Sequence, residues 1–316
     1  MSKVIFVIAI QNNSFNKHFV LDKKFLMCYN PHMEVDIMIK AIQIAYDEHF
    51  ELKCKLASDA GFDGVAVNFH DMTDRSDKAW EEAPERILSI LKTNNLKPVQ
   101  SHLPYYDLRI SAEELDEEME KAMLKSIETS GKIGCPWCVY HPRSAVNNGF
   151  SSKKALEINK KVISRYIECA DKHGTGIALE NLPIFGFYPM MPFYTSDWSD
   201  LLELTLSFNT ENAGICWDVG HANMLHLNQA EAIEAFGDKL KCTHIHNNFT
   251  TRDDHLPPDQ GNVDWKNVIG AMKKIGFEGP LTLETHCRYH DEALLASFAK
   301  HNLECLKFII REAENK

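Results

Sequence analysis

Residues 214–221 read GICWDVGH, in which a short apolar run ends in the acidic side chain of Asp218. Runs of this kind recur along the chain, and longer amphipathic stretches separate them. Such an alternation predicts repeated βα units and a parallel sheet. The eight predicted strands are residues 4–10, 64–69, 98–102, 138–141, 176–180, 214–218, 241–246 and 281–284.

Eight βα units predict a (β/α)8 TIM barrel, and a chain of 316 residues falls within the size range of single-domain barrels. The ends of the intervening stretches support this assignment. Asp197 and Asp264 stand where a helix N-cap is needed, and Gly61 and Gly276 stand where a left-handed C-cap is needed. We therefore predict one domain over residues 1–316.

Two connections are longer than a barrel requires, and both are predicted insertions. The first covers about residues 11–46. The second covers about residues 182–196 and includes the aromatic stretch LPIFGFYPMMPFY at 182–194. This stretch is either an aromatic lid over the barrel mouth or a packed surface loop or subunit contact, and the sequence leaves both interpretations open.

Composition and charge indicate which kinds of partner the protein binds and in which compartment it is found. The net charge of −11 and the absence of long Lys and Arg clusters argue against a nucleic-acid-binding protein. Polar Gln11 follows the apolar run 4–10 where a signal cleavage site would need small residues, and no run is long enough to span a membrane. We expect a soluble, cytoplasmic protein that acts on a small molecule, and homo-oligomerisation stays open.

The cysteines are predicted to be reduced thiols. There are nine, an odd number scattered through predicted helices and strands, which does not suggest a disulfide framework. Cys135 and Cys138 form a CPWC motif. This motif leads into a strand and does not open a helix, so we interpret the pair as buried thiols and not as a redox dithiol.

Polar or ionisable side chains follow nearly every predicted strand. In a closed barrel these positions meet at the C-terminal mouth, where active sites lie. Taken singly, each histidine among them is more typical of a structural residue, but three carboxylates meeting at one mouth would repel each other without a cation. The residues at the strand ends are His70, His102, His141, Glu180, Asp218, His246 and Glu284.

The carboxylates and a histidine predict a metal centre. Glu180, Asp218, His246 and Glu284 would supply one nitrogen and three carboxylates, a donor set that suits Mn²⁺ first and also Zn²⁺, Co²⁺ or Mg²⁺. His244 also points inward, because residues two apart in a strand share a face. His246 lies nearer the mouth and is the preferred ligand.

Two further segments can reach the mouth. His221 stands three residues after Asp218, close enough to contact substrate or a further metal. The loop after the seventh predicted strand carries Arg252, Asp253 and His255. Arg252 is predicted to bind a substrate oxygen, and Asp253 and His255 are candidates for an additional metal. The alternative is a solvated loop.

These motifs, together, resemble the xylose-isomerase-like barrels, which include sugar isomerases, ketose 3-epimerases, inosose dehydratases and metal-dependent abasic-site endonucleases. The resemblance runs from about residue 52 to residue 304. It is carried by ALEN at Glu180, CWDVGHA at Asp218, HIHN at His246, DDHLPPDQGNVDW and TLETH at Glu284.

The resemblance implies specific roles. In the epimerase branch the metal ligands match Glu180, Asp218, His246 and Glu284, and His221 and Arg252 match substrate-binding positions. The two glutamates would act as acid and base on a sugar carbon through a metal-stabilised enediolate. His102 and His141 are further expected substrate contacts. The expected function is therefore a metal-dependent sugar isomerase or epimerase.

Two alternatives remain. The endonuclease branch has a trinuclear zinc site, which the resemblance maps onto the same four ligands together with His102, His141, His221, Asp253 and His255. The acidic net charge favours sugar chemistry over DNA repair. The other alternative is a non-catalytic, metal-binding barrel.

The sequence does not name the substrate. Arg109, Arg143 and Arg288 follow strand ends, where they would hold a phosphate or carboxylate or lie as ordinary surface residues.

Overall fold

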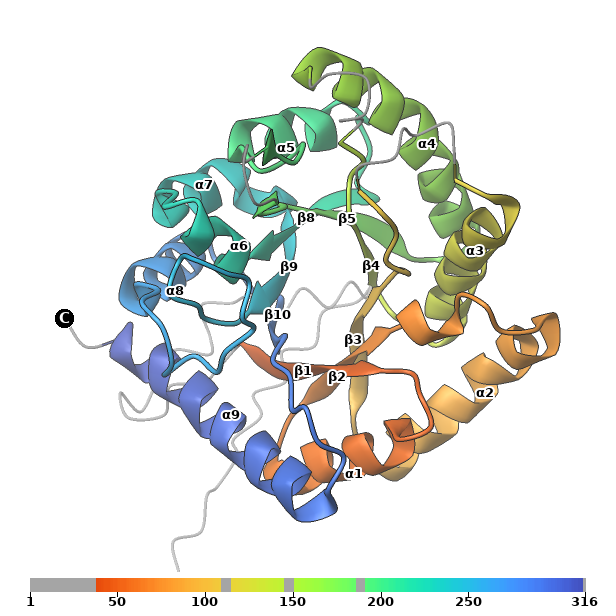
Figure 1. Cartoon of the computed structure of the whole chain (residues 1–316), viewed down its shortest axis with the longest axis vertical. Helices are drawn as coiled ribbons and strands as arrows, with labels where there is room; N and C mark the ends of the chain where they lie inside the picture. Colours follow the sequence, from red (N-terminus) through yellow and green to blue (C-terminus); the bar gives the residue numbers. More distant parts are fainter. Residues whose placement is uncertain (1–37, 109–114, 145–150, 186–190, 315–316) are drawn as a thin grey trace, which may run out of the picture. The chain divides into compact units, whose positions relative to one another are not determined.

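The computed structural model describes residues 38–108, 115–144, 151–185 and 191–314. Within these residues, eight parallel strands close into a barrel in the order β1-β10-β9-β8-β5-β4-β3-β2, and helices surround it (Figure 1). This confirms the predicted (β/α)8 TIM barrel. The barrel strands are β1 (Ile39–Ala45), β2 (Gly64–Asn68), β3 (Lys97–His102), β4 (Trp137–Tyr140), β5 (Gly176–Glu180), β8 (Ala213–Asp218), β9 (Leu240–Ile245) and β10 (Pro280–Leu283).

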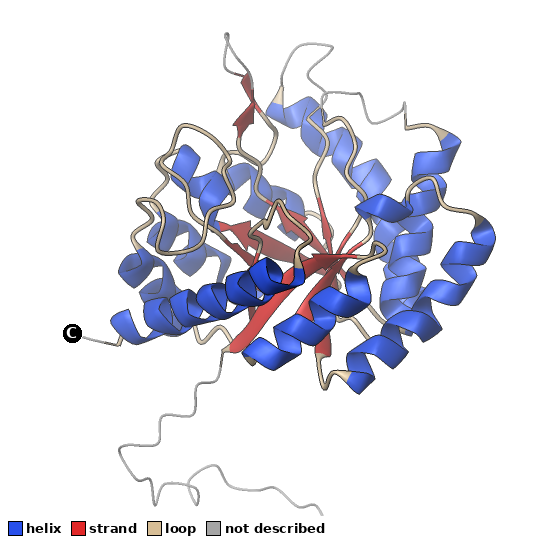
Figure 2. Cartoon of the chain, turned by 60° about the horizontal axis from the view of Figure 1, so that its bottom comes forward, coloured by secondary structure: helices blue, strands red, loops and turns tan. Residues whose placement is uncertain are grey.

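The helices of the described residues pack outside the strands (Figure 2). Asp197 and Asp264 cap α5 (Trp198–Leu206) and α8 (Trp265–Lys274) as predicted, since each side chain accepts a hydrogen bond from a backbone N–H of the first turn. Gly61 has the left-handed φ of 104° that the end of α1 (Phe50–Ala60) requires. The helices are α1 (Phe50–Ala60), α2 (Asp77–Thr93), α3 (Glu117–Lys132), α4 (Ser152–His173), α5 (Trp198–Leu206), α6 (Val219–Met224), α7 (Gln229–Phe236), α8 (Trp265–Lys274) and α9 (Glu292–Glu312).

The first barrel strand is not the one predicted. β1 covers Ile39–Ala45 and pairs with β10 on one side and β2 on the other, so it closes the barrel. The predicted strand at residues 4–10 lies outside the described residues and is not among these eight strands. The predicted insertion at 11–46 is therefore wrong at its C-terminal end, and the part before residue 38 lies outside the described residues. Whether residues 1–316 form one domain stays a prediction.

The second predicted insertion contains a short antiparallel pair. β6 (Ile184–Phe185) pairs with β7 (Met191–Pro192), apart from the barrel sheet (Figure 2). Residues 186–190 lie outside the described residues. The role of this segment as a lid stays a prediction.

The interior of the barrel is filled at the end where the strands begin. Trp137, the first residue of β4, packs against a small buried cluster made of Val139, Ala178, Cys216 and Cys242. Gly176 leaves the space for its ring, because a Cβ at that position would lie 2.3 Å from a Trp137 ring carbon. Polar side chains occupy the opposite end, where the strands finish.

Gly176→Ala is expected to destabilise the barrel. The added methyl group would overlap the Trp137 ring, and overpacking of a closed interior costs about 1–3 kcal/mol. The measurement is the free energy of unfolding in urea. Gly270→Ala is the matched control, because no heavy atom lies within 4 Å of its added Cβ. Its position inside α8 predicts a gain of about 1 kcal/mol from helix propensity. Equal stability of Gly176→Ala and the parent would contradict this packing.

The described cysteines are free thiols, as predicted. Cys135 and Cys138 are both buried, and burial raises the pKa of each thiol, which opposes the thiolate that redox chemistry needs.

Among the described residues no helix is both long and apolar enough to cross a bilayer.

Candidate metal centre

Three buried carboxylates meet at the C-terminal mouth of the barrel. Glu180 and Asp218 are the last residues of β5 and β8, and Glu284 follows β10 directly. Each has 5% or less of its surface exposed. Parallel strands bring their C-terminal ends to one rim, so residues more than a hundred positions apart become neighbours.

His244 lies among all three carboxylates. Its Nδ1 is 3.2 Å from Oε1 of Glu180, 3.1 Å from Oε2 of Glu284 and 3.7 Å from Oδ2 of Asp218. These four residues form one group whose ligand atoms lie within 4.8 Å of one another. His244 is fully buried on β9, and neither ring nitrogen has a hydrogen bond of acceptable geometry among the described residues.

This arrangement fits a divalent cation. With metal–ligand bonds of about 2.1 Å, neighbouring ligand atoms lie about 3.0 Å apart in an octahedral shell and about 3.4 Å apart in a tetrahedral one. Two of the separations from His244 Nδ1, 3.2 Å to Glu180 and 3.1 Å to Glu284, fall within this range, and the third, 3.7 Å to Asp218, is slightly longer. His244 Nδ1 is buried, has no hydrogen bond and is surrounded by carboxylate oxygens. Buried polar atoms normally have a partner, and a cation bound by this nitrogen and these oxygens would provide one.

His246 lies next to this group and contacts Asp218. Its Nε2 lies 3.0 and 3.1 Å from the two oxygens of Asp218. It belongs to two other groups, one with Asp218 and His221 and one with His255 and Glu284. The structure therefore brings together three of the four predicted ligands and places His244, not His246, within reach of all three carboxylates.

Two pairs of histidines flank the centre. On one side, Nε2 of His102 and Nε2 of His141 lie 3.3 and 3.0 Å from Oε2 of Glu180. On the other side, Nε2 of His221 and Nε2 of His255 lie 3.2 and 3.0 Å from Oδ2 of Asp253. His102, His141, His221, His255 and Asp253 thus lie around the three carboxylates, whereas His70, also predicted at the mouth, is exposed and packs its ring against Tyr105.

The carboxylates and imidazoles of the centre shift one another's pKa values. Burial alone would raise the pKa of Glu180, but His244 and His141 outweigh it and hold this pKa well below its usual value. The pKa of Glu284 is also lowered, chiefly by His244. Burial would lower the pKa of His255, yet Glu284 and Asp253 raise it to about 9. The charged forms of Glu180, Glu284 and His255 therefore favour one another, and a cation bound here would compete with the imidazole protons.

Three of the predicted arginines, Arg143, Arg252 and Arg288, do not line this centre. Arg252 is 75% exposed and donates to Asp254. Arg143 is fully buried and bonds Tyr140, Tyr166 and Glu120, so it is a structural residue. Arg288 is exposed, and Arg109 lies outside the described residues.

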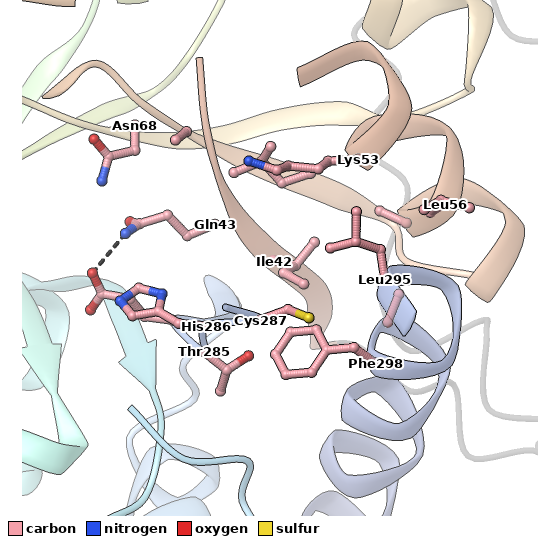
Figure 3. A pocket seen from close by; sticks show the side chains of 15 residues that line it. Ile42, Gln43, Lys53, Leu56, Asn68, Thr285, His286, Cys287, Leu295 and Phe298 are labelled. Atoms are coloured by element: carbon pink, nitrogen blue, oxygen red, sulfur yellow. Dashed lines mark hydrogen bonds between the residues drawn. The ribbon is translucent and has the colours of Figure 1, made fainter. Parts of the chain in front are cut away.

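A cavity of about 220 Å³ opens beside Glu284. It lies between β1 and the helices α1 and α9, and Figure 3 shows Ile42, Leu295 and Phe298 on its apolar side. On its polar side the Nε2 of Gln43 donates to Oε1 of Glu284 at 2.6 Å (Figure 3). A small molecule can therefore approach this carboxylate through a partly apolar space.

Residues 54–307 match the sequence profile of the xylose isomerase-like TIM barrel family. The chain belongs to this family. An uncharacterized protein of Methanocaldococcus jannaschii is 28% identical over 67% of this chain and 72% of its own length. Inosose isomerase of Bacillus subtilis is 27% identical over 39% of this chain and 44% of its own length, so that alignment spans less than half of the enzyme.

Solved structures agree with this assignment at the level of the fold. A D-tagatose 3-epimerase-like protein superposes with a TM-score of 0.65 at 22% identity, covering 87% of this chain and 99% of the other. The xylose isomerase-like resemblance predicted from the motifs is thus confirmed.

Several polar residues of this xylose isomerase-like barrel were not predicted. Gln43 holds Glu284, and it was missed because it lies on the misassigned first strand. Asn68 at the end of β2 donates to the Tyr105 hydroxyl, whose ring stacks on His141. Asn181 accepts a hydrogen bond from the Asp218 N–H, which fixes the backbone at Asp218. Only Asn68 and Asn181 carried a sequence signal, since both stand at strand ends.

Proposed function

We propose that this protein is a divalent-metal-dependent isomerase or epimerase of a sugar or a sugar-like hydroxy-ketone. One observation carries the proposal: two buried glutamates, Glu180 and Glu284, reach the same histidine nitrogen from strands separated by β8 and β9. Two carboxylates at one centre can exchange a proton with a carbon atom held between them.

The relatives support this class of reaction. One of them is an inosose isomerase and one solved structure is a D-tagatose 3-epimerase-like protein. Both names describe rearrangement of a carbohydrate or a related ring. The cavity beside Glu284 is of a size that accepts part of such a molecule.

The cation is proposed to be held by Glu180, Asp218, Glu284 and a histidine of β9. Geometry favours His244, and His246 is the ligand predicted from its place at the strand end. A set of one nitrogen and three carboxylates suits Mn²⁺ first, with Zn²⁺, Co²⁺ and Mg²⁺ as alternatives. When bound, the cation supplies Lewis acidity that stabilises negative charge on the substrate oxygens beside the reacting carbon.

The chain's own groups would move the proton. Glu180 and Glu284 act as the base and acid, and the histidines on either side orient the substrate. His141 and His102 hold one oxygen of Glu180, while Gln43 holds one oxygen of Glu284, so neither carboxylate is free to rotate. His221 is a proposed substrate contact. Arg252 remains a predicted one that would have to leave Asp254.

Solvent deuterium exchange tests this function. Candidate ketoses are incubated with the protein and Mn²⁺ in D₂O, and mass spectrometry follows label at the carbon beside the carbonyl. We expect one deuterium in the true substrate, none after removal of metal with a chelator, and recovery when Mn²⁺ is added back. The proposal fails if no member of a broad panel of sugars, inososes and phosphorylated sugars acquires label.

A second function is favoured by the flanking histidine pairs. The pair on Glu180 and the pair on Asp253 each bring two nitrogens beside a carboxylate, so donor atoms for more than one cation gather at the mouth. A trinuclear zinc centre of this kind would suit hydrolysis of an abasic-site duplex. Cleavage of such a duplex, together with three zinc ions per chain by mass spectrometry, would rank this function first.

A further inference from the structure

A cluster of three metal-binding residue types lies outside the barrel mouth. Asp259 comes from the loop between β9 and α8, and His301 and Cys305 both lie on α9. Nε2 of His301 is 3.1 Å from Oδ1 of Asp259 and 3.5 Å from Sγ of Cys305. The three donor atoms lie within 4.8 Å of one another.

The spacing of the two helical residues explains this convergence. His301 and Cys305 are four positions apart, so they lie on the same face of α9, one turn from each other. Both Asp259 and Cys305 approach the same nitrogen of the imidazole. A Cys-His-Asp catalytic triad would instead place the carboxylate and the thiol on different ring nitrogens. The oxygen of Asp259, the nitrogen of His301 and the sulfur of Cys305 therefore point toward one common position.

The distances match those of a tetrahedral zinc site. Bonds of about 2.3 Å to sulfur and about 2.1 Å to nitrogen place these two ligand atoms about 3.6 Å apart, and nitrogen and oxygen ligands about 3.4 Å apart. The observed values are 3.5 and 3.1 Å. Cys305 is 7% exposed, whereas the side chains of Asp259 and His301 are 43% and 48% exposed. The cluster thus has a buried side and a solvent side through which an ion and a water ligand can enter.

The loop residue is held in place. The carbonyl oxygen of Pro258, next to Asp259, accepts hydrogen bonds from the Asn247 side chain and the Trp265 indole, each at 2.8 Å. Two of the three donors lie on one long helix. Little chain ordering is therefore needed for binding, which is the condition for a preformed metal site.

We propose that Asp259, His301 and Cys305 form a peripheral binding site for a divalent cation such as Zn²⁺, with water as the fourth ligand. Binding replaces the thiol proton of Cys305 with the cation, and that proton passes to solvent. The bound ion ties α9 to the loop that also carries Asp253 and His255. This site does not depend on the function proposed for the barrel mouth.

Cobalt spectroscopy on the full-length protein tests the site. Co²⁺ bound to a thiolate gives a charge-transfer absorption that carboxylate and imidazole ligands do not give. We expect this band in the parent and in Cys169→Ser, a control cysteine on α4. We expect its loss in Cys305→Ser and in His301→Asn. Persistence of the full band in Cys305→Ser would overturn the proposal.

Zinc content gives an independent measurement. After exposure to excess Zn²⁺ and desalting, the parent should hold one more zinc per chain than His301→Asn. His301 is half exposed, so its replacement leaves the fold intact, which the melting temperature of the metal-free proteins verifies. Equal zinc content in two folded proteins would refute the site. An unfolded Cys305→Ser would leave His301→Asn as the deciding variant.

Discussion

Glu180→Gln and Glu284→Gln are each expected to lose about 10²- to 10⁴-fold in the rate of substrate interconversion, the usual contribution of a positioned acid or base. The amide keeps the shape of the side chain but cannot take up the proton, and it removes one negative charge from the centre. The measurement is the rate of interconversion of the substrate identified by deuterium exchange. Glu278→Gln, an exposed glutamate, is the control and should keep the parent rate.

The two variants should also differ from each other. If each glutamate serves one face of the substrate carbon, then each variant retains exchange with solvent for only one of the two epimers. The reciprocal pattern would separate an acid–base role from simple loss of the cation, which would abolish exchange of both epimers. Full activity in either variant would remove that glutamate from the proposed mechanism.

His244→Asn is expected to weaken Mn²⁺ binding by at least about 10- to 100-fold, a loss that is typical even for residues that only support a ligand. Its Nδ1 is the nitrogen that reaches all three carboxylates. His246→Asn, which faces Asp218, should have the smaller effect. Calorimetric titration of metal-free protein with Mn²⁺ measures both. Mn²⁺ also avoids the thiolate cluster on α9, because it prefers oxygen donors.

The control for this comparison is His226→Asn. His226 is exposed and has a φ of 51°, a backbone conformation that asparagine tolerates. The reverse ranking, with the larger loss in His246→Asn, would assign the ligand to His246 as the strand-end argument predicted. Equal affinity in all three variants would place the cation elsewhere.

The sequence predicted the barrel and the carboxylates because both depend on local patterns. Seven of the predicted strands fall on barrel strands, and Glu180, Asp218 and Glu284 end three of them. The first strand was misassigned because residues 4–10 are continuously apolar. The true strand, IKAIQIA, mixes apolar residues with Lys40 and Gln43. A strand that contributes a polar residue to the mouth has the weaker hydrophobic signal.

The choice between His244 and His246 could not be settled by periodicity. Residues two apart share a face, so the pattern HIH placed both imidazoles inside the barrel but did not give their depth. Depth depends on the stagger of neighbouring strands and on side-chain rotamers. The structure pairs Asp218 with His244 in the register of β8 and β9, which brings that histidine level with the carboxylate.

Trp137 and the side chains packed above it fill the barrel where its strands begin, so the two glutamates, at the opposite ends of the strands, face the mouth. A substrate bound at this mouth would keep solvent away from the glutamates that it covers. A hydrogen lifted from carbon would then stay with the carboxylate that took it, and part of it would go back to the same face of the same molecule before it could mix with the bulk. In D₂O the recovered starting epimer should therefore gain deuterium more slowly than the product epimer, whose hydrogen comes from the opposite glutamate, and the ratio of the two rates would report how tightly the bound substrate seals the mouth.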